Sequence, residues 1–142
     1  HSFEDDPAVL FFSTHQYPHY PGTGRETERG RGAGEGFTIN VPMEAGEGGE
    51  EYRDIFQKSL VPTADSFKPE FVIVSAGFDA HKDDPLGNMG LTEEGYADLT
   101  GIVAGIAKRH AGGRILSSLE GGYHLTSLAA SVDRHIQALL AA

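Results

Sequence analysis

The 142-residue sequence contains no cysteine. Disulfide bonds and thiolate metal sites are therefore excluded, while the redox compartment stays undetermined. The sequence also has no apolar run of transmembrane length, and its first residues form neither a basic leader nor an apolar signal segment. From these absences we expect a soluble, cytoplasmic protein.

Basic residues are few, because 11 Lys and Arg stand against 21 Asp and Glu, for a formal net charge of −10. This balance argues against binding to nucleic-acid phosphates or to an anionic membrane. It sets no limit on a small cationic or lysine-containing substrate. The chain length suits one domain that is large enough to bury a hydrophobic core.

Four short apolar runs predict strands, at residues 8–12, 37–41, 71–74 and 115–119. Three amphipathic stretches predict helices that begin near Glu50, Thr92 and Thr126, and Pro62 should kink or end the first of them. Because the later strands alternate with helices, the sequence predicts an α/β fold with a mostly parallel sheet and helical crossovers.

Both later helices carry an apolar stripe that we expect to face the core. In the helix from Thr92 the stripe is Tyr96, Leu99, Ile102, Val103 and Ile106. In the last helix it is Leu128, Ala129, Val132, Ile136, Leu139 and Leu140.

The run Phe71–Val74 has no polar alternation, which is typical of a parallel strand buried on both faces. Asp79 follows just beyond its carboxyl end, where open α/β sheets bind ligands. An isolated Asp after a strand more often tightens a turn, and that reading stays open for Asp79.

Polar residues follow three of the predicted strands, as Ser13-Thr14-His15, Gly77-Phe78-Asp79 and Gly121-Gly122-Tyr123. A carboxylate is an acceptable zinc ligand, and a tyrosine after two glycines can approach a carbonyl and hydrogen-bond its developing oxyanion. Tyr123 also fits a partly buried core position. For His81 we expect a surface or supporting place rather than metal ligation. The charged stretch Arg25–Gly36 fits a flexible loop or, with less support, a partner-binding segment.

Five segments together resemble the carboxyl-terminal half of the histone deacetylase family. They are Phe11-Phe-Ser-Thr-His15, Tyr20-Pro-Gly-Thr-Gly24, Gly36-Phe-Thr-Ile-Asn-Val-Pro42, Val74-Ser-Ala-Gly-Phe-Asp-Ala-His81 with Asp84-Pro-Leu86, and Leu119-Glu-Gly-Gly-Tyr123. The version here is similar to the bacterial deacetylase and acetylpolyamine amidohydrolase branch, which is class II-like. The resemblance implies a three-layer arginase/deacetylase-like fold, here lacking its amino-terminal part.

The resemblance also implies roles for individual residues. Asp79 matches a ligand of the catalytic zinc, and Tyr123 matches the tyrosine that stabilises the tetrahedral intermediate. Other positions match the substrate channel (Tyr20, Leu86, Gly121, Gly122), an inner monovalent-cation site that usually holds potassium (Ser13, Thr14), and backbone ligands of an outer cation site (Phe3, Asp6, Val9, Phe37).

The family's Asp-x-His ligand pair and tandem histidines lie upstream of the position where this sequence starts. A catalytic zinc takes three protein ligands, and one aspartate cannot hold it. We therefore expect residues 1–142 to be the carboxyl-terminal portion of a single deacetylase domain, inactive alone. The complete enzyme would remove acetyl groups from acetyl-lysine or acetylpolyamine. The alternative is a truncated, non-catalytic domain that associates with a copy of itself or with a separate amino-terminal piece.

Overall fold

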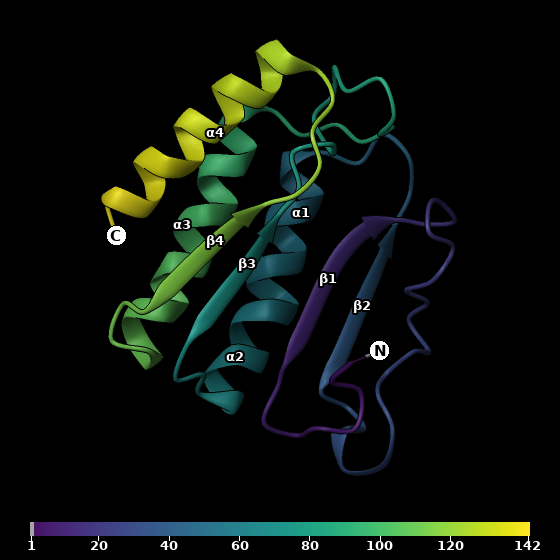
Figure 1. Ribbon diagram of the computed structural model, residues 1–142, viewed down its shortest axis with the longest axis vertical. Helices are drawn as coiled ribbons and strands as arrows, with labels where there is room; N and C mark the ends of the chain where they lie inside the picture. The colour runs from purple at the N-terminus through teal and green to yellow at the C-terminus, as the bar shows by residue number, and fades with distance from the viewer. Residues whose placement is uncertain (1) are drawn as a thin grey trace. The chain divides into compact units, whose positions relative to one another are not determined.

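The computed structural model describes residues 2–142, and the chain forms two compact units, His1–Ala45 and Gly46–Ala142. In the first unit, β1 (Phe11–Gln16) pairs in parallel with β2 (Thr38–Met43), as Figure 1 shows. The short helical turn Gly32–Gly34 lies in the connection between them.

Both strands of the first unit differ in their bounds from the prediction. β1 begins three residues later than expected, because residues before it form a turn in which Ala8 N and Val9 N donate to Asp6. β2 continues through Pro42 to Met43, so Pro42 does not close this strand.

The second unit contains a parallel pair of strands, β3 (Val72–Ala76) and β4 (Ile115–Leu119). The crossover between them is α3 (Glu93–His110), and α4 (Leu125–Leu140) follows β4 (Figure 1). Thr92 caps α3, since its Oγ1 accepts the Gly95 N–H at 3.3 Å. The parallel strands and helical crossover confirm the predicted α/β class.

The first helical stretch of this unit continues past Pro62. It comprises α1 (Gly49–Ile55), the π-helical turn η2 (Phe56–Leu60) and α2 (Val61–Phe67). Of the two effects predicted for Pro62, an end of the helix is wrong, because Pro62 lies in the first turn of α2, where a missing N–H costs little; a kink stays a prediction. The stretch ends at Lys68, which adopts a left-handed conformation with φ 59°.

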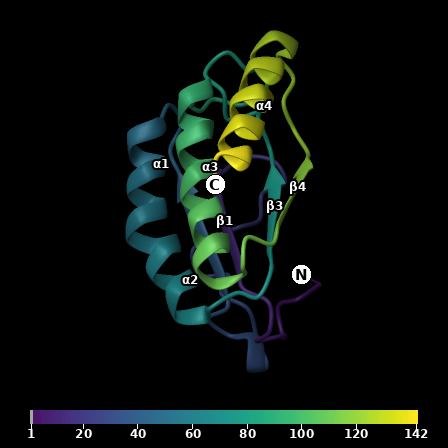
Figure 2. The ribbon, with the colours of Figure 1, turned by 90° about the vertical axis from the view of Figure 1, so that its left-hand side faces the viewer.

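Helices α3 and α4 cover one face of the β3–β4 pair, as the edge-on view in Figure 2 shows. On the other face, Phe71, Ile73 and Leu116 are 51%, 70% and 49% exposed. The prediction that this strand is buried on both faces is therefore wrong for residues 2–142. Alternate side chains point to opposite faces of a strand, and the helices shield only one of them.

The two long helices treat their apolar stripes differently. In α3, Tyr96, Leu99 and Ile106 are buried as predicted. In α4 the buried residues are Ser127, Ser131 and His135, whereas Ile136 and Leu140 of the predicted stripe are 48% and 83% exposed. The prediction holds only in part: Leu128, Val132 and Leu139 are half-buried, whereas Ala129, Ile136 and Leu140 are exposed, and the most buried positions are those of the small serines and the hydrogen-bonded His135. No helix within residues 2–142 is long and apolar enough to cross a membrane.

Candidate active site

The chain segments that follow β3 and β4 stay side by side beyond the last paired residues of the sheet. The Glu120 N–H donates to the Ala76 carbonyl at 3.0 Å, and the Phe78 N–H donates to the Gly121 carbonyl at 2.9 Å. These two bonds bring the residues after β3 against the residues after β4, so that Asp79 lies next to Gly121.

The Asp79 carboxylate is half-buried between two glycines. A Cβ atom on Gly121 would lie 2.4 Å from Asp79 Oδ2, and one on Gly77 would lie 2.9 Å from Oδ1. Within residues 2–142 this carboxylate accepts no hydrogen bond, so it does not cap a turn there. Both oxygens therefore stay available to a ligand, which favours the functional reading of Asp79.

Asp79 contributes to raising the pKa of two buried tyrosines, Tyr52 and Tyr96. Burial raises the pKa of the Tyr52 hydroxyl, and the negative charge of Asp79 raises it further. Burial also raises the pKa of Tyr96, with smaller contributions from Tyr52 and Asp79. Both hydroxyls therefore remain uncharged.

Tyr123 follows Gly122, whose φ of 132° is in the range that favours glycine. A Cβ atom on Gly122 would lie 2.8 Å from Leu128 Cδ1 and 3.1 Å from Phe78 Cβ, so the chain passes too close to its neighbours for another residue. Tyr123 is 53% exposed, so the alternative that it is a partly buried core tyrosine is wrong. An exposed phenol two residues after Gly121 can donate to a carbonyl oxygen bound near Asp79.

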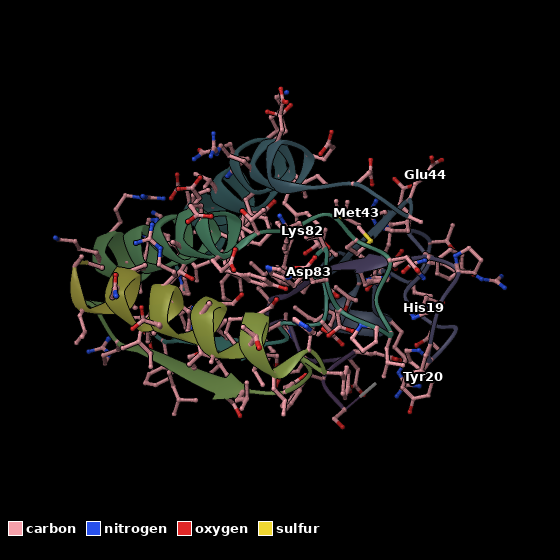
Figure 3. The ribbon with its side chains drawn as sticks, turned by 90° about the horizontal axis from the view of Figure 1, so that it is seen from above. His19, Tyr20, Met43, Glu44, Lys82 and Asp83 are labelled. Atoms are coloured by element: carbon pink, nitrogen blue, oxygen red, sulfur yellow. The ribbon has the colours of Figure 1, made fainter. Side chains whose placement is uncertain are left out.

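Asp84 lies in the loop between β3 and α3, and sequence analysis assigned it no role. Its neighbours Lys82 and Asp83 are exposed (Figure 3), whereas Asp84 is only 7% exposed. Its Oδ1 accepts N–H groups of Leu86 and Gly87 at 2.9 and 3.0 Å, and its Oδ2 accepts the Tyr123 N–H at 2.7 Å. Leu86, predicted at the channel rim, is 58% exposed.

Burial acts to raise the pKa of the Asp84 carboxyl, but N–H groups of Tyr123, Leu86, Gly87 and His124 outweigh it and hold the pKa below its usual range. Asp84 is therefore a buried carboxylate that keeps its charge. In the sequence only the family segment Asp84-Pro-Leu86 sets Asp84 apart from exposed Asp83, and that segment gives Asp84 no role.

His81 is 1% exposed, so the expected surface place is wrong. Its Nδ1 accepts the Asp83 N–H at 3.1 Å, and its Nε2 lies 3.4 Å from Glu93 Oε2. The main chain of His81 also pairs with Leu91. His81 therefore supports the loop that carries Asp79, in agreement with the supporting place that we also expected.

In the first unit, β1 carries Ser13 and Thr14. The Ser13 hydroxyl lies 2.9 Å from His15 Nδ1, and His15 Nε2 lies 2.8 Å from the Gly24 carbonyl oxygen. His15 therefore ties the loop after β1 to the strand, a contact that the sequence did not reveal. Tyr20, predicted in the channel wall, lies in this loop, where Figure 3 labels it. It is 91% exposed.

The residues predicted for the outer cation site lie in the turn before β1 and next to β2. The carbonyl oxygens of Phe3, Asp6 and Phe37 each accept a main-chain hydrogen bond, from Asp6, Val9 and Phe11 respectively. A carbonyl oxygen has two lone pairs, so one such bond does not by itself exclude it as a cation ligand. Both monovalent-cation sites stay predictions.

The family resemblance predicts that Asp79 is a ligand of a catalytic zinc ion. Residues 2–142 contain no group of three or more His, Cys, Asp or Glu that could hold a metal ion. A catalytic zinc takes three protein ligands, so the described residues do not by themselves fit the ion. They supply one unbonded carboxylate.

Comparison with known proteins identifies the family and the fold. The Histone deacetylase domain family matches residues 1–139. The chain belongs to the histone deacetylase family. Histone deacetylase 14, chloroplastic, of Arabidopsis thaliana is 45% identical over 139 residues, which cover 98% of this chain and 33% of that protein.

Polyamine deacetylase HDAC10 of Homo sapiens is 48% identical over 145 residues, which cover 97% of this chain and 21% of that protein. The crystal structure of the HDA15 HD domain superposes with a TM-score of 0.91 at 42% identity, covering 98% of this chain and 39% of that one. The chain therefore shares the arginase/deacetylase-like fold of the histone deacetylase family. It spans about a third or less of the length of the two curated relatives named here.

Proposed function

We propose that this chain forms part of a zinc-dependent amide hydrolase that removes acetyl groups from acetyl-lysine or acetylpolyamine. The observation that carries the proposal is the unbonded Asp79 carboxylate held against Gly121, with half-exposed Tyr123 two residues further along. Relatives named deacetylase and polyamine deacetylase support the reaction class and both substrate types.

Each of these residues has a proposed task. Asp79 would supply one ligand of the zinc, with the other ligands coming from outside the described residues. When bound, zinc supplies Lewis-acid polarisation of the substrate carbonyl. Tyr123 donates its hydroxyl proton in a hydrogen bond to the carbonyl oxygen as negative charge develops there. Gly121 and Gly122 would line the substrate channel with main chain alone, since neither carries a side chain.

The test measures release of acetate from an acetyl-lysine peptide and from acetylated spermidine. A longer protein that contains this chain should be active, and the 142-residue chain alone should be inactive. Tyr123→Phe removes only the hydroxyl and should lower kcat about 100-fold, the usual cost of one oxyanion donor. The control Tyr17→Phe removes a hydroxyl of the first unit that accepts a hydrogen bond from Arg25 of the same unit. It should leave kcat unchanged.

Activity that survives both Tyr123→Phe and a zinc chelator would contradict the proposed mechanism. Full activity of the 142-residue chain alone would contradict the need for further ligands. The ratio of kcat/KM between the two substrates decides which acetylated amine is preferred. A cytoplasmic location and the monovalent cations remain predictions.

A second candidate is a non-catalytic domain that acts by association. The open face of β3–β4 favours it, because Phe71, Ile73 and Leu116 are about half exposed or more. Sedimentation of the 142-residue chain separates the candidates, since a monomer at all concentrations would count against association with a copy of itself.

A further inference from the structure

We propose that Asp84 is the positioning residue of Tyr123. Its carboxylate joins the loop after β3 to the segment after β4, and so sets where the tyrosine stands relative to Asp79. This inference rests on the proposed function for its catalytic meaning. The hydrogen-bond geometry that it uses does not depend on the reaction.

The two carboxylate oxygens of Asp84 bind different parts of the chain. Oδ1 closes the loop locally, through the N–H groups of Leu86 and Gly87. Oδ2 reaches 39 positions along the chain to the Tyr123 N–H, and at 2.7 Å this is the shortest of the three bonds. A charged acceptor makes such bonds roughly twice as strong as a neutral one.

Tyr123 lies between the end of β4 and the start of α4, in neither the strand nor the helix. The last bond between the strand-end segments is made by the Gly121 carbonyl, and α4 begins at Leu125. Gly122, which lies between Gly121 and Tyr123, packs against Leu128 and Phe78 but has no side chain of its own to hold this segment. The Asp84 bond therefore fixes the main chain at the point from which the tyrosine side chain projects.

The loop that carries Asp84 is itself held in place by main-chain hydrogen bonds. Asp84 is buried, and its loop is attached to the rest of the unit, since Lys82 N donates to the Leu91 carbonyl and Leu91 N donates to the Ala80 carbonyl at 2.9 and 3.1 Å. Gly87 also passes so close to Asp79 that a Cβ there would lie 1.9 Å from the Asp79 carbonyl oxygen. One loop thus holds both Asp79 and, through Asp84, Tyr123.

The first experiment is nuclear magnetic resonance on the 142-residue chain. A scalar coupling across the hydrogen bond should connect the Tyr123 amide nitrogen with the Asp84 carboxyl carbon in the unaltered protein. Asp84→Ala should speed amide exchange of Tyr123 about tenfold or more, while the β3–β4 amides keep their protection. Asp83→Ala, at the exposed neighbour, should change neither.

The second experiment uses an active protein that contains this chain. Asp84→Asn keeps the side-chain volume and should lower kcat about tenfold with little change in KM, since a displaced group loses transition-state contact more than substrate binding. If Asp84 acts through Tyr123, the double variant with Tyr123→Phe should be no slower than Tyr123→Phe alone, within about twofold.

Absence of the coupling, or Tyr123 exchange that is unchanged in a folded Asp84→Ala chain, would overturn the proposal. So would kinetic effects of Asp84→Asn and Tyr123→Phe that multiply. If Asp84→Ala does not fold, the coupling in the unaltered chain still decides. If the longer protein hydrolyses no acetyl amide, the proposed function fails, while the coupling and exchange still decide whether Asp84 holds Tyr123.

Discussion

Asp84 and His135 are both 7% exposed in the second unit, yet Asp84 keeps its charge and His135 is kept neutral. Asp84 accepts main-chain N–H groups from two segments of chain. His135 instead connects two hydroxyls, with Nδ1 2.7 Å from Thr100 Oγ1 and Nε2 2.8 Å from Ser117 Oγ. Burial lowers the pKa of His135, because nothing around it compensates a positive charge.

The partners of His135 also assign its proton. The Thr100 hydroxyl donates its single hydrogen to the Tyr96 carbonyl at 2.6 Å, so it accepts from His135 Nδ1–H. His135 Nε2 then accepts from the Ser117 hydroxyl. The difference teaches that burial permits a charge only where fixed dipoles surround it, as main-chain amides surround Asp84.

The largest expected effect comes from removing the charged group. Asp84→Ala leaves up to four N–H groups without their acceptor and should lower the free energy of unfolding by about 3 kcal/mol. Urea unfolding of the 142-residue chain measures this, with Asp83→Ala as the exposed control. A loss no larger than that of the control would mean that water replaces the carboxylate freely.

Removing the neutral group should cost less. His135→Leu leaves the Ser117 hydroxyl of β4 without its partner and the Thr100 hydroxyl of α3 with only its bond to the Tyr96 carbonyl. It should lower the free energy of unfolding by about 2 kcal/mol. The same urea measurement applies, and the double variant Thr100→Val/His135→Leu should recover part of the loss. An unchanged stability in His135→Leu would show that the hydroxyls find other partners.

The strand-end region should also tolerate less added volume than the helix beside His135. Gly121→Ala puts a Cβ atom 2.4 Å from Asp79 Oδ2 and should destabilise by about 1 to 2 kcal/mol. Gly101→Ala, next to Thr100 in α3, meets nothing within 4 Å and should stabilise by about 0.5 to 1 kcal/mol, since alanine is the better helix former. Equal effects of the two substitutions on the unfolding midpoint would break the comparison.

The smallest effect should be a dependence of stability on pH. His135 has its ordinary pKa of 6.5 when unfolded and a lower pKa when folded, so below pH 6.5 the unfolded chain binds more protons. Stability is therefore complete above pH 6.5 and falls as pH drops toward the lowered folded value. Asp84 adds nothing in this window, because its pKa is lowered from 3.8. As the pH is lowered from about 7.5 to about 5, the urea midpoint of unfolding should fall more steeply in the unaltered chain than in His135→Leu.

Much of the fold could be predicted from the sequence, because its signals are local. The apolar runs gave all four strands to within a few residues, and the Thr92 cap marked the start of α3. The motif around Asp79 and the later Glu-Gly-Gly-Tyr pointed to the histone deacetylase family, which the family match confirms. The same motifs indicated that Asp79 and Gly121 belong to one site, and the strand-end bonds place them together.

Only the tertiary structure decided which side chains are buried and what holds them. The apolar stripe of α4 predicted only part of the buried face: Leu128, Val132 and Leu139 are half-buried, but the most buried residues include small Ser131 and the hydrogen-bonded His135. The segment Asp84-Pro-Leu86 marks Asp84 but does not say where its side chain lies, and folding alone turns Asp83 toward solvent and Asp84 toward the Tyr123 N–H. Hydrophobic periodicity and motifs are written along the chain, whereas the partners of a buried polar group come from segments tens of residues away.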